Sequence, residues 1–328
     1  MAEKIIKRFL TTVAPDTRMR TITPKDACQA PSKNLAIASP ARPPRQVIEL
    51  ALQHEHRYSG NHAESLVPNQ SDDPRDLFDL LLRESKGKPF VYDDGDMRSL
   101  HFDERLMQSA MWLAAPDELV FGYTRAMMGF LLFNPAPHDI LMIGLGGGSL
   151  AKYCYRHLPS TRITVLEVDA DVIALRDKFM IPADDARFQV IHADAVDYIT
   201  HTDQNVDVIL LDGFNIDGAV PELNSQSFYA ACQRILHPQG ILVTNLWSEA
   251  ADLTILMSRL HMEFDYRVWR ARSVDSHNLL FFSFNSTRNS PAHRSLMKLA
   301  IQLDQRFKLG LPQLVERLHA TTTDGRGS

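Results

Sequence analysis

The chain has 328 residues and a mass of 37.1 kDa, with 45% hydrophobic residues, 23% charged residues and a formal net charge of -5. This composition is ordinary for a globular protein, and the length predicts two units or one large domain with appendages. A membrane protein is excluded because no apolar run approaches the ~18–20 residues of a span, and the acidic balance gives no support to nucleic-acid binding.

Cysteine and histidine usage offers no metal site. Cys28, Cys154 and Cys232 form no CxxC pair, so neither a disulfide framework nor a zinc site is predicted. His54 and His56 have no carboxylate or cysteine at a spacing that would complete a site. We expect no metal, and this cysteine usage favours a reducing compartment, so we expect a cytoplasmic protein.

Residues 1–75 form a proline-rich, basic segment. They hold eight of the eighteen prolines. Residues 1–45 carry nine Lys or Arg and three acids, so their formal net charge is +6, whereas that of the rest of the chain is -11. Proline removes backbone donors and restricts its neighbours, so we expect a largely disordered lead-in with one short helix at 47–53. An organelle-targeting peptide is an alternative that the three acids weaken.

A small β unit is predicted at residues 76–120. A short amphipathic helix opens it after Asp73-Pro74, since proline suits the first helical position. The apolar face of this helix is formed by Leu77, Leu80 and Leu81. A tight turn at Asp94-Gly95 joins the first two strands. The predicted strands are Phe90–Tyr92, Leu100–Phe102 and Leu106–Gln108. So small a sheet is unstable alone and must pack on something larger.

Residues 121–290 alternate short apolar strands with amphipathic helices, after a helical segment at 121–133. The predicted strands are 139–144, 162–168, 188–192, 207–211 and 240–244. This alternation predicts an α/β domain with a parallel sheet covered on both faces. Two more strands, 266–270 and 279–284, are expected to pair as a terminal antiparallel hairpin. That plan indicates an S-adenosylmethionine-type Rossmann-like domain, followed at 291–328 by a helix and tail that Ser290-Pro291 caps.

A glycine-rich turn follows the first of these strands and opens a helix. Gly144, Gly146 and Gly148 supply a backbone that can pass close under a nucleoside and still turn sharply. We therefore assign these three glycines to nucleotide binding.

Acidic residues end the next three strands of the predicted sheet. They are Glu167, Asp194 and Asp212. The carboxyl ends of parallel strands form one crevice in which open α/β sheets bind ligands, so we expect the three acids to converge. A carboxylate at Glu167 suits the two ribose hydroxyls, and one at Asp194 suits an adenine amino group. Asp169 is expected to cap the next helix.

At these residues the sequence resembles the spermidine synthase family, the aminopropyltransferases of polyamine biosynthesis, over roughly residues 89–284. The segments that carry the resemblance are Leu106–Ser109, Pro135-x-Pro137, Leu166–Ile173, Asp194-Ala195 and Asp207–Asp212. The resemblance implies decarboxylated S-adenosylmethionine as donor, a small cationic amine such as putrescine as acceptor, and a homodimer. It assigns Gln108, Glu167, Asp194 and Ala195 to the donor. Asp212 would take a proton from the attacking amine or orient it.

The sequence departs from this family at two acidic positions. The family's loop aspartate, which binds the ammonium of the donor, is Gly147 here, and a polyamine-binding aspartate is replaced by Asn215, with Asp217 close by. The family's Tyr-x-Glu pattern is not kept around Tyr123. We expect Asn215, Asp217 and Tyr123 to face the acceptor, and the segment 213–225 to form a lid. An ammonium without its carboxylate loses ~1–3 kcal/mol of charge-assisted bonding.

Aminopropyl transfer is therefore the first of three alternatives. An S-adenosylmethionine-dependent methyltransferase is the second, because the helix N-terminus at Ser149 suits the carboxylate that only the intact donor carries. A non-catalytic nucleoside-binding relative is the third. A nicotinamide-dependent dehydrogenase is disfavoured by the terminal hairpin and by Asp194.

Overall fold

The computed structural model describes residues 74–102, 107–215, 218–248, 250–286 and 292–321. All of them belong to one of the two units into which the chain divides, Pro43–Ser328. The lead-in, the short helix expected at 47–53 and the Ser290-Pro291 cap lie outside the described residues.

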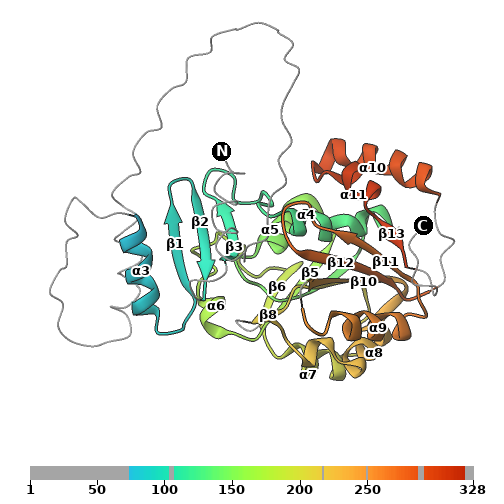
Figure 1. The fold of residues 1–328 in the computed structure, drawn as a ribbon, viewed down its shortest axis with the longest axis horizontal. Helices are drawn as coiled ribbons and strands as arrows, with labels where there is room; N and C mark the ends of the chain where they lie inside the picture. The colour runs from blue at the N-terminus through green and yellow to red at the C-terminus, as the bar shows by residue number, and fades with distance from the viewer. Residues whose placement is uncertain (1–73, 103–106, 216–217, 249, 287–291, 322–328) are drawn as a thin grey trace, which may run out of the picture. The chain divides into compact units, whose positions relative to one another are not determined.

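A mixed sheet is the centre of the described part of the chain (Figure 1). Its strands are β4 (Asp139–Ile143), β5 (Arg162–Glu167), β6 (Phe188–His192), β7 (Val206–Leu211), β10 (Leu236–Trp247), β11 (Val268–Arg272), β12 (Asn278–Phe284) and β13 (His319–Ala320). They lie in the order β13-β11-β12-β10-β7-β4-β5-β6. The pairs from β10 to β6 are parallel, whereas β12 pairs antiparallel with both β10 and β11. The parallel sheet with a terminal antiparallel hairpin is thus confirmed.

The apolar runs of the strands are buried on both faces of this sheet. In β4, Ile140 and Met142 belong to one hydrophobic cluster, whereas Leu141 and Ile143 belong to the other. Side chains alternate across a strand, so a strand that is apolar at every position needs a cover on each side. The sheet is therefore the middle of three layers.

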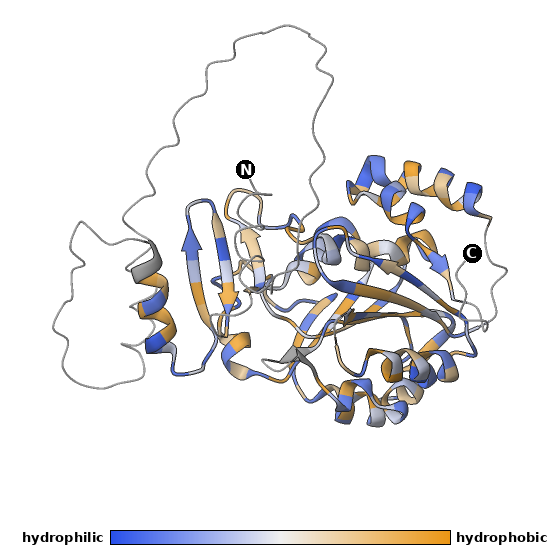
Figure 2. Ribbon diagram, in the orientation of Figure 1, coloured by the Kyte–Doolittle hydropathy of each residue, from blue (hydrophilic) through white to orange (hydrophobic). Residues whose placement is uncertain are grey.

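Helices supply the two covers. One cover consists of α4 (Gly122–Met127), η2 (Met128–Leu132), α5 (Ser149–His157), α6 (Ala170–Ala174), α10 (His293–Phe307) and α11 (Leu311–Glu316). The other consists of α7 (Ala195–His201), α8 (Gln226–Ile235) and α9 (Leu253–Glu263). Hydrophobic and hydrophilic residues are interspersed along α10, as expected for a helix with one solvent face (Figure 2). Within the described ranges, no helix combines the length and apolarity that a membrane crossing requires.

A three-stranded antiparallel sheet precedes the large one. It consists of β1 (Phe90–Asp94), β2 (Met97–His101) and β3 (Met107–Trp112), with α3 (Pro74–Ser85) before it. The buried Lys152 of α5 joins this sheet to the large domain, because its Nζ donates to Met111 Sδ at 3.0 Å and to the carbonyl of Phe179 at 2.8 Å. Burial lowers the pKa of Lys152 to about 8, and the charge of Asp117 opposes part of that change.

Several helix details differ from the expectation. Leu80 is 45% exposed, and Phe78 instead packs on the small sheet, with its ring 5.0 Å from that of His101. The helix after β5 ends at Ala174 and continues as turns, although the apolar pattern predicted a helix reaching Phe179. α10 begins after Ala292, which provides no side-chain cap. The division at residues 75, 120 and 290 stays a prediction.

Candidate active site

A pocket of about 280 Å³ lies at the carboxyl ends of β4, β5 and β7, and β3 of the small sheet forms one wall. β5 and β6 lie on one side of β4, and β7 returns to its other side. Such a switch point is where open α/β sheets bind ligands, and the volume is near the lower end of small-molecule sites, ~300 Å³. The predicted site residues that line it are Gln108, Tyr123, Gly144, Gly146, Glu167, Asp194, Ala195 and Asp212.

The glycine turn brings the backbone of β4 against that of β7. Gly144 has a φ of +95°, and a Cβ added there would lie 2.5 Å from the carbonyl oxygen of Asp212. Only glycine fits this close approach and this left-handed conformation. Gly148 is not among the lining residues; it is the N-cap of α5, and an added Cβ would meet Ile181.

Glu167 ties the end of β5 to the glycine turn. Its Oε2 accepts from the backbone N–H of Leu145 at 2.8 Å, and its Oε1 accepts from that of Asp169 at 2.9 Å. An ionised carboxylate has about four acceptor positions, so each oxygen keeps one for a ligand hydroxyl. The side chain is thus buried and oriented by the backbone while it lines the pocket.

Asp194 is the N-cap of α7. Its Oδ1 accepts from the backbone N–H groups of Val196 at 2.7 Å and Asp197 at 3.0 Å. The capping bonds engage one oxygen and leave Oδ2 for a donor in the pocket. Asp169 caps α6 by accepting from Asp171 N–H at 2.8 Å, and that prediction is confirmed.

Asp212 lies at the end of β7, between Asn245 and Tyr123. Its Oδ1 accepts from Nδ2 of Asn245 at 2.8 Å, and the Tyr123 hydroxyl lies beside the same carboxylate and favours its charged form. Burial raises the pKa of Asp212 above its ordinary value, and the bonds from Asn245 and Tyr123 lower part of that rise. Burial and the adjacent Asp212 charge raise the pKa of Tyr123 well above its usual range. The phenol of Tyr123 therefore stays neutral beside the carboxyl group of Asp212.

A second amide extends this chain of hydrogen bonds. Asn278 donates from Nδ2 to Oδ1 of Asn245 at 2.9 Å, and both amides are buried. The sequence reasoning missed Asn245 and Asn278. The signal available was a polar side chain inside the apolar run Val243-Thr244-Asn245-Leu246, because the predicted strand 240–244 ends one residue before Asn245.

The predicted acceptor side is placed in part. Tyr123 lines the pocket, and so do Val220, Glu222 and Leu223 of the segment expected to form a lid. That segment contains a two-stranded hairpin, β8 (Phe214–Asn215) and β9 (Gly218–Ala219), followed by η3 (Glu222–Asn224). The side chain of Asn215 and the whole of Asp217 lie outside the described residues.

At Gly147, where the resemblance leads one to expect an aspartate, neighbouring side chains occupy the space that an aspartate side chain would need. A Cβ added to Gly147 would lie 2.6 Å from Ser109 Oγ and 2.9 Å from Phe179 Cδ1. Ser109 Oγ also lies 3.3 Å from Ser149 Oγ. An acidic side chain at residue 147 therefore requires its neighbours to move. Among the residues that the structure describes, no three His, Cys, Asp or Glu side chains are grouped to hold a metal ion.

Solved structures share the fold. A probable spermidine synthase from Corynebacterium glutamicum aligns with a TM-score of 0.56 and 20% identity, covering 65% of this chain and 83% of that one. Human methyltransferase-like protein 13 in complex with SAH aligns with a TM-score of 0.53 and 23% identity, covering 57% of this chain and 92% of that one. At these identities the likeness establishes the methyltransferase-like fold.

Sequence comparison is more specific. The spermine/spermidine synthase domain matches residues 120–257. The polyamine aminopropyltransferase of Chromobacterium violaceum is 35% identical over 238 residues, which cover 72% of this chain and 91% of that relative. The enzyme of the same name from Neisseria meningitidis serogroup A is 36% identical over 233 residues, which cover 70% and 89%. The chain therefore belongs to the spermine/spermidine synthase family, whose members are polyamine aminopropyltransferases.

Proposed function

We propose that this transferase moves an aminopropyl group from decarboxylated S-adenosylmethionine to a small cationic amine such as putrescine. The observation that carries the proposal is the carboxylate of Asp212, held by Tyr123 and Asn245 in the same pocket as Glu167 and Asp194. That Glu167, Asp194 and Asp212 line one cavity supports the assignment of two acids to the donor and one to the reacting amine.

The nucleoside end of the donor is assigned to the strand ends. The free acceptor positions of Glu167 suit the two ribose hydroxyls, and Oδ2 of Asp194 suits the adenine amino group. Ala195 and Gln108 line the same pocket, Gln108 from the small sheet. Gly144 and Gly146 let the backbone pass beneath the ligand.

Asp212 faces the chemistry in this proposal. The attacking nitrogen, which is a neutral amino group of the otherwise cationic acceptor, bonds to the propyl carbon while the C–S bond breaks and its electron pair goes to sulfur. The nitrogen then loses a proton. Asp212 orients the amine and accepts that proton, which requires the ionised carboxylate. Tyr123, Asn215 and Asp217 are assigned to the acceptor. Because burial raises the pKa of Asp212, the carboxylate is protonated earlier as the pH is lowered. We therefore expect the acid-side loss of activity to begin at a higher pH than an ordinary aspartate would give.

Methyl transfer from intact S-adenosylmethionine is the second candidate. It is favoured by the filled space at Gly147, because the ammonium of the donor tail meets no loop carboxylate there. The first N–H groups of α5 suit the carboxylate that only the intact donor has.

Two experiments separate these functions. Calorimetric titration with each donor form is expected to give tighter binding of the decarboxylated form. Incubation of that form with putrescine should then yield spermidine and methylthioadenosine by mass spectrometry. Asp212→Asn should lower turnover by about 10²–10⁴-fold, whereas the exposed Asp203→Asn should not. Tighter binding of the intact donor together with a methylated amine would replace this function by the second.

We also propose a cytoplasmic homodimer that binds neither nucleic acid nor membrane. Membership of the family and the cysteine pattern support it. Light scattering coupled to gel filtration tests the dimer, and a mass of one chain at micromolar concentration would contradict it.

A further inference from the structure

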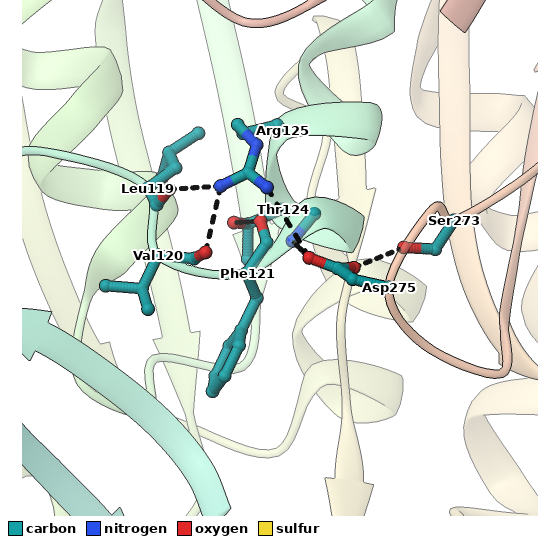
Figure 3. Close-up of polar contacts among 8 residues, drawn as sticks. Leu119, Val120, Phe121, Thr124, Arg125, Ser273 and Asp275 are labelled. Carbon is teal, nitrogen blue, oxygen red and sulfur yellow. Dashed lines mark hydrogen bonds and ion pairs between the residues drawn. The ribbon is translucent and has the colours of Figure 1, made fainter. Parts of the chain in front are cut away.

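The connection between β11 and β12, residues 273–277, reaches α4 through one carboxylate (Figure 3). Asp275 Oδ2 accepts from the backbone N–H of Gly122 at 2.8 Å and from Arg125 Nη2 at 3.4 Å. Its Oδ1 accepts from Ser273 Oγ at 3.0 Å. Asp275 thus binds a free backbone donor in the first turn of α4, directly before Tyr123.

Arg125 completes a clamp on the chain that enters α4 (Figure 3). Its Nη1 donates to the carbonyls of Leu119 at 2.7 Å and Val120 at 2.8 Å. A Cβ on Gly122 would collide with the Asp275 carboxylate, so glycine is required for this close approach. The clamp fixes where α4 begins and, with it, where the Tyr123 hydroxyl lies.

The same connection ends at Asn278, the first residue of β12. An ionised carboxylate only accepts, so Asn245 must present its NH₂ group to Asp212 and its carbonyl oxygen to Asn278. Asn278 therefore has to donate, as its Nδ2 does at 2.9 Å. The identity of residue 278 thus determines which end of the Asn245 amide faces Asp212.

We infer that this connection, through Asp275 at its middle and through Asn278 directly after it, positions Tyr123 and Asn245, the two polar side chains that flank the Asp212 carboxylate. Asp275 acts on Tyr123 through the clamp, and Asn278 acts on Asn245 through the amide pair. Both are positioning residues, and the inference rests on the proposed role of Asp212.

Loss of either donor removes a bond that stabilises the charged form of Asp212. Burial raises the pKa of this carboxyl, and the two bonds oppose the rise, so a misplaced donor raises the pKa further. The other titratable groups lining the pocket are Tyr123, Glu167, Asp194 and Glu222. Substitutions at residues 275 and 278 leave Glu167, Asp194 and Glu222 in place and act on Tyr123 only through its position.

The test measures the titration of Asp212 directly, by NMR of protein carrying ¹³C-labelled aspartate carboxyls. The resonance of Asp212 is assigned by its loss in Asp212→Asn. The test variants are Asp275→Ala and Asn278→Leu, which removes the donor without adding a charge, and the matched control is Val274→Ala, on an exposed side chain of the same connection. We expect a raised Asp212 pKa and about tenfold lower kcat with a shifted acid limb in both test variants, and neither change in the control.

Repeating the measurement in the Tyr123→Phe variant distinguishes a positioning effect from a general loss of local structure. In Tyr123→Phe, Asp275→Ala should no longer move the Asp212 titration, because the hydroxyl it positions is gone, while Asn278→Leu should still move it. Asp275→Asn keeps an acceptor for Gly122 N–H and should restore most of the effect of Asp275→Ala. An unmoved titration in folded Asp275→Ala and Asn278→Leu overturns the inference. A moved titration in a chain without aminopropyl transfer would uphold the positioning and refute the proposed function.

Discussion

At the scale of single residues, the carboxylate of Asp212 lies where folding and chemistry make opposite demands. Burial penalises its charged form, and the donors Tyr123 and Asn245 compensate in part, so its pKa stays above the ordinary value. Proton acceptance needs the charged form. A group of this kind lowers stability at the pH at which it is useful.

Asp212→Asn is expected to stabilise the protein while it removes activity. A carboxyl whose folded pKa is raised contributes most to stability when protonated, and that contribution is lost as the pH rises through the folded pKa. The neutral amide should therefore increase the free energy of unfolding near neutral pH, and the gain should shrink as the pH falls toward ~4, the ordinary aspartate range. Urea denaturation at several pH values measures this. A less stable variant at neutral pH would contradict it.

Gly147→Asp tests whether the loop has adapted to the absence of an acid. The new side chain meets Ser109 Oγ and Phe179, so we expect a loss of about 1–3 kcal/mol in the free energy of unfolding. Combining it with Ser109→Gly removes one obstacle, and the double variant should lose less than the sum of the single variants. It should also gain affinity for the decarboxylated donor relative to the intact one. Strict additivity in denaturation would mean that Ser109 does not occupy this space.

At the scale of elements, long apolar patterns predicted the strands of the parallel sheet and its terminal hairpin well. β4 and β7 are apolar runs buried on both faces, whereas the edge strand β6 is exposed at Gln189 and His192. Helix ends were less predictable, because α6 stops at Ala174 while its apolar pattern continues through turns to Phe179. The amide pair of the site could not be predicted, since it depends on which strands are neighbours rather than on any local pattern.

The packing of α3 gives a prediction at this scale. Phe78 makes edge contacts with the rings of Phe90 at 5.5 Å and Tyr92 at 5.3 Å, whereas Leu80 is largely exposed. Phe78→Ala should lower the free energy of unfolding by about 2 kcal/mol, and Leu80→Ala should change it by less than about 0.5 kcal/mol. Chemical denaturation of both variants decides which face of α3 is buried. Equal losses would favour the face with Leu77, Leu80 and Leu81 that the sequence predicted.

At the scale of the whole molecule, the pocket belongs to two sheets. Gln108 and Ser109 come from β3 of the small sheet, whereas Glu167 and Asp212 come from the large one. The buried Lys152 joins the same two parts beneath the glycine turn. We therefore expect a ligand in this pocket to be bound by both sheets and to link their opening motions.

Hydrogen exchange tests that link. A donor at 100 times its dissociation constant stabilises the bound state by about 2.7 kcal/mol, so amides that open only after release should exchange about 100-fold more slowly. We expect this in β3, in the glycine turn and at the start of α7, for the donor form that calorimetry selects. β11 lines no part of the pocket, so its amides should slow less on donor binding than those of β3. Amides of β11 that exchange only through global unfolding are excluded from this comparison, because any bound ligand slows them. Gln108→Ala should lose the protection in β3 first. Protection confined to the large sheet would mean that the donor binds there alone, and that β3 is a wall of the cavity without being a partner of the ligand.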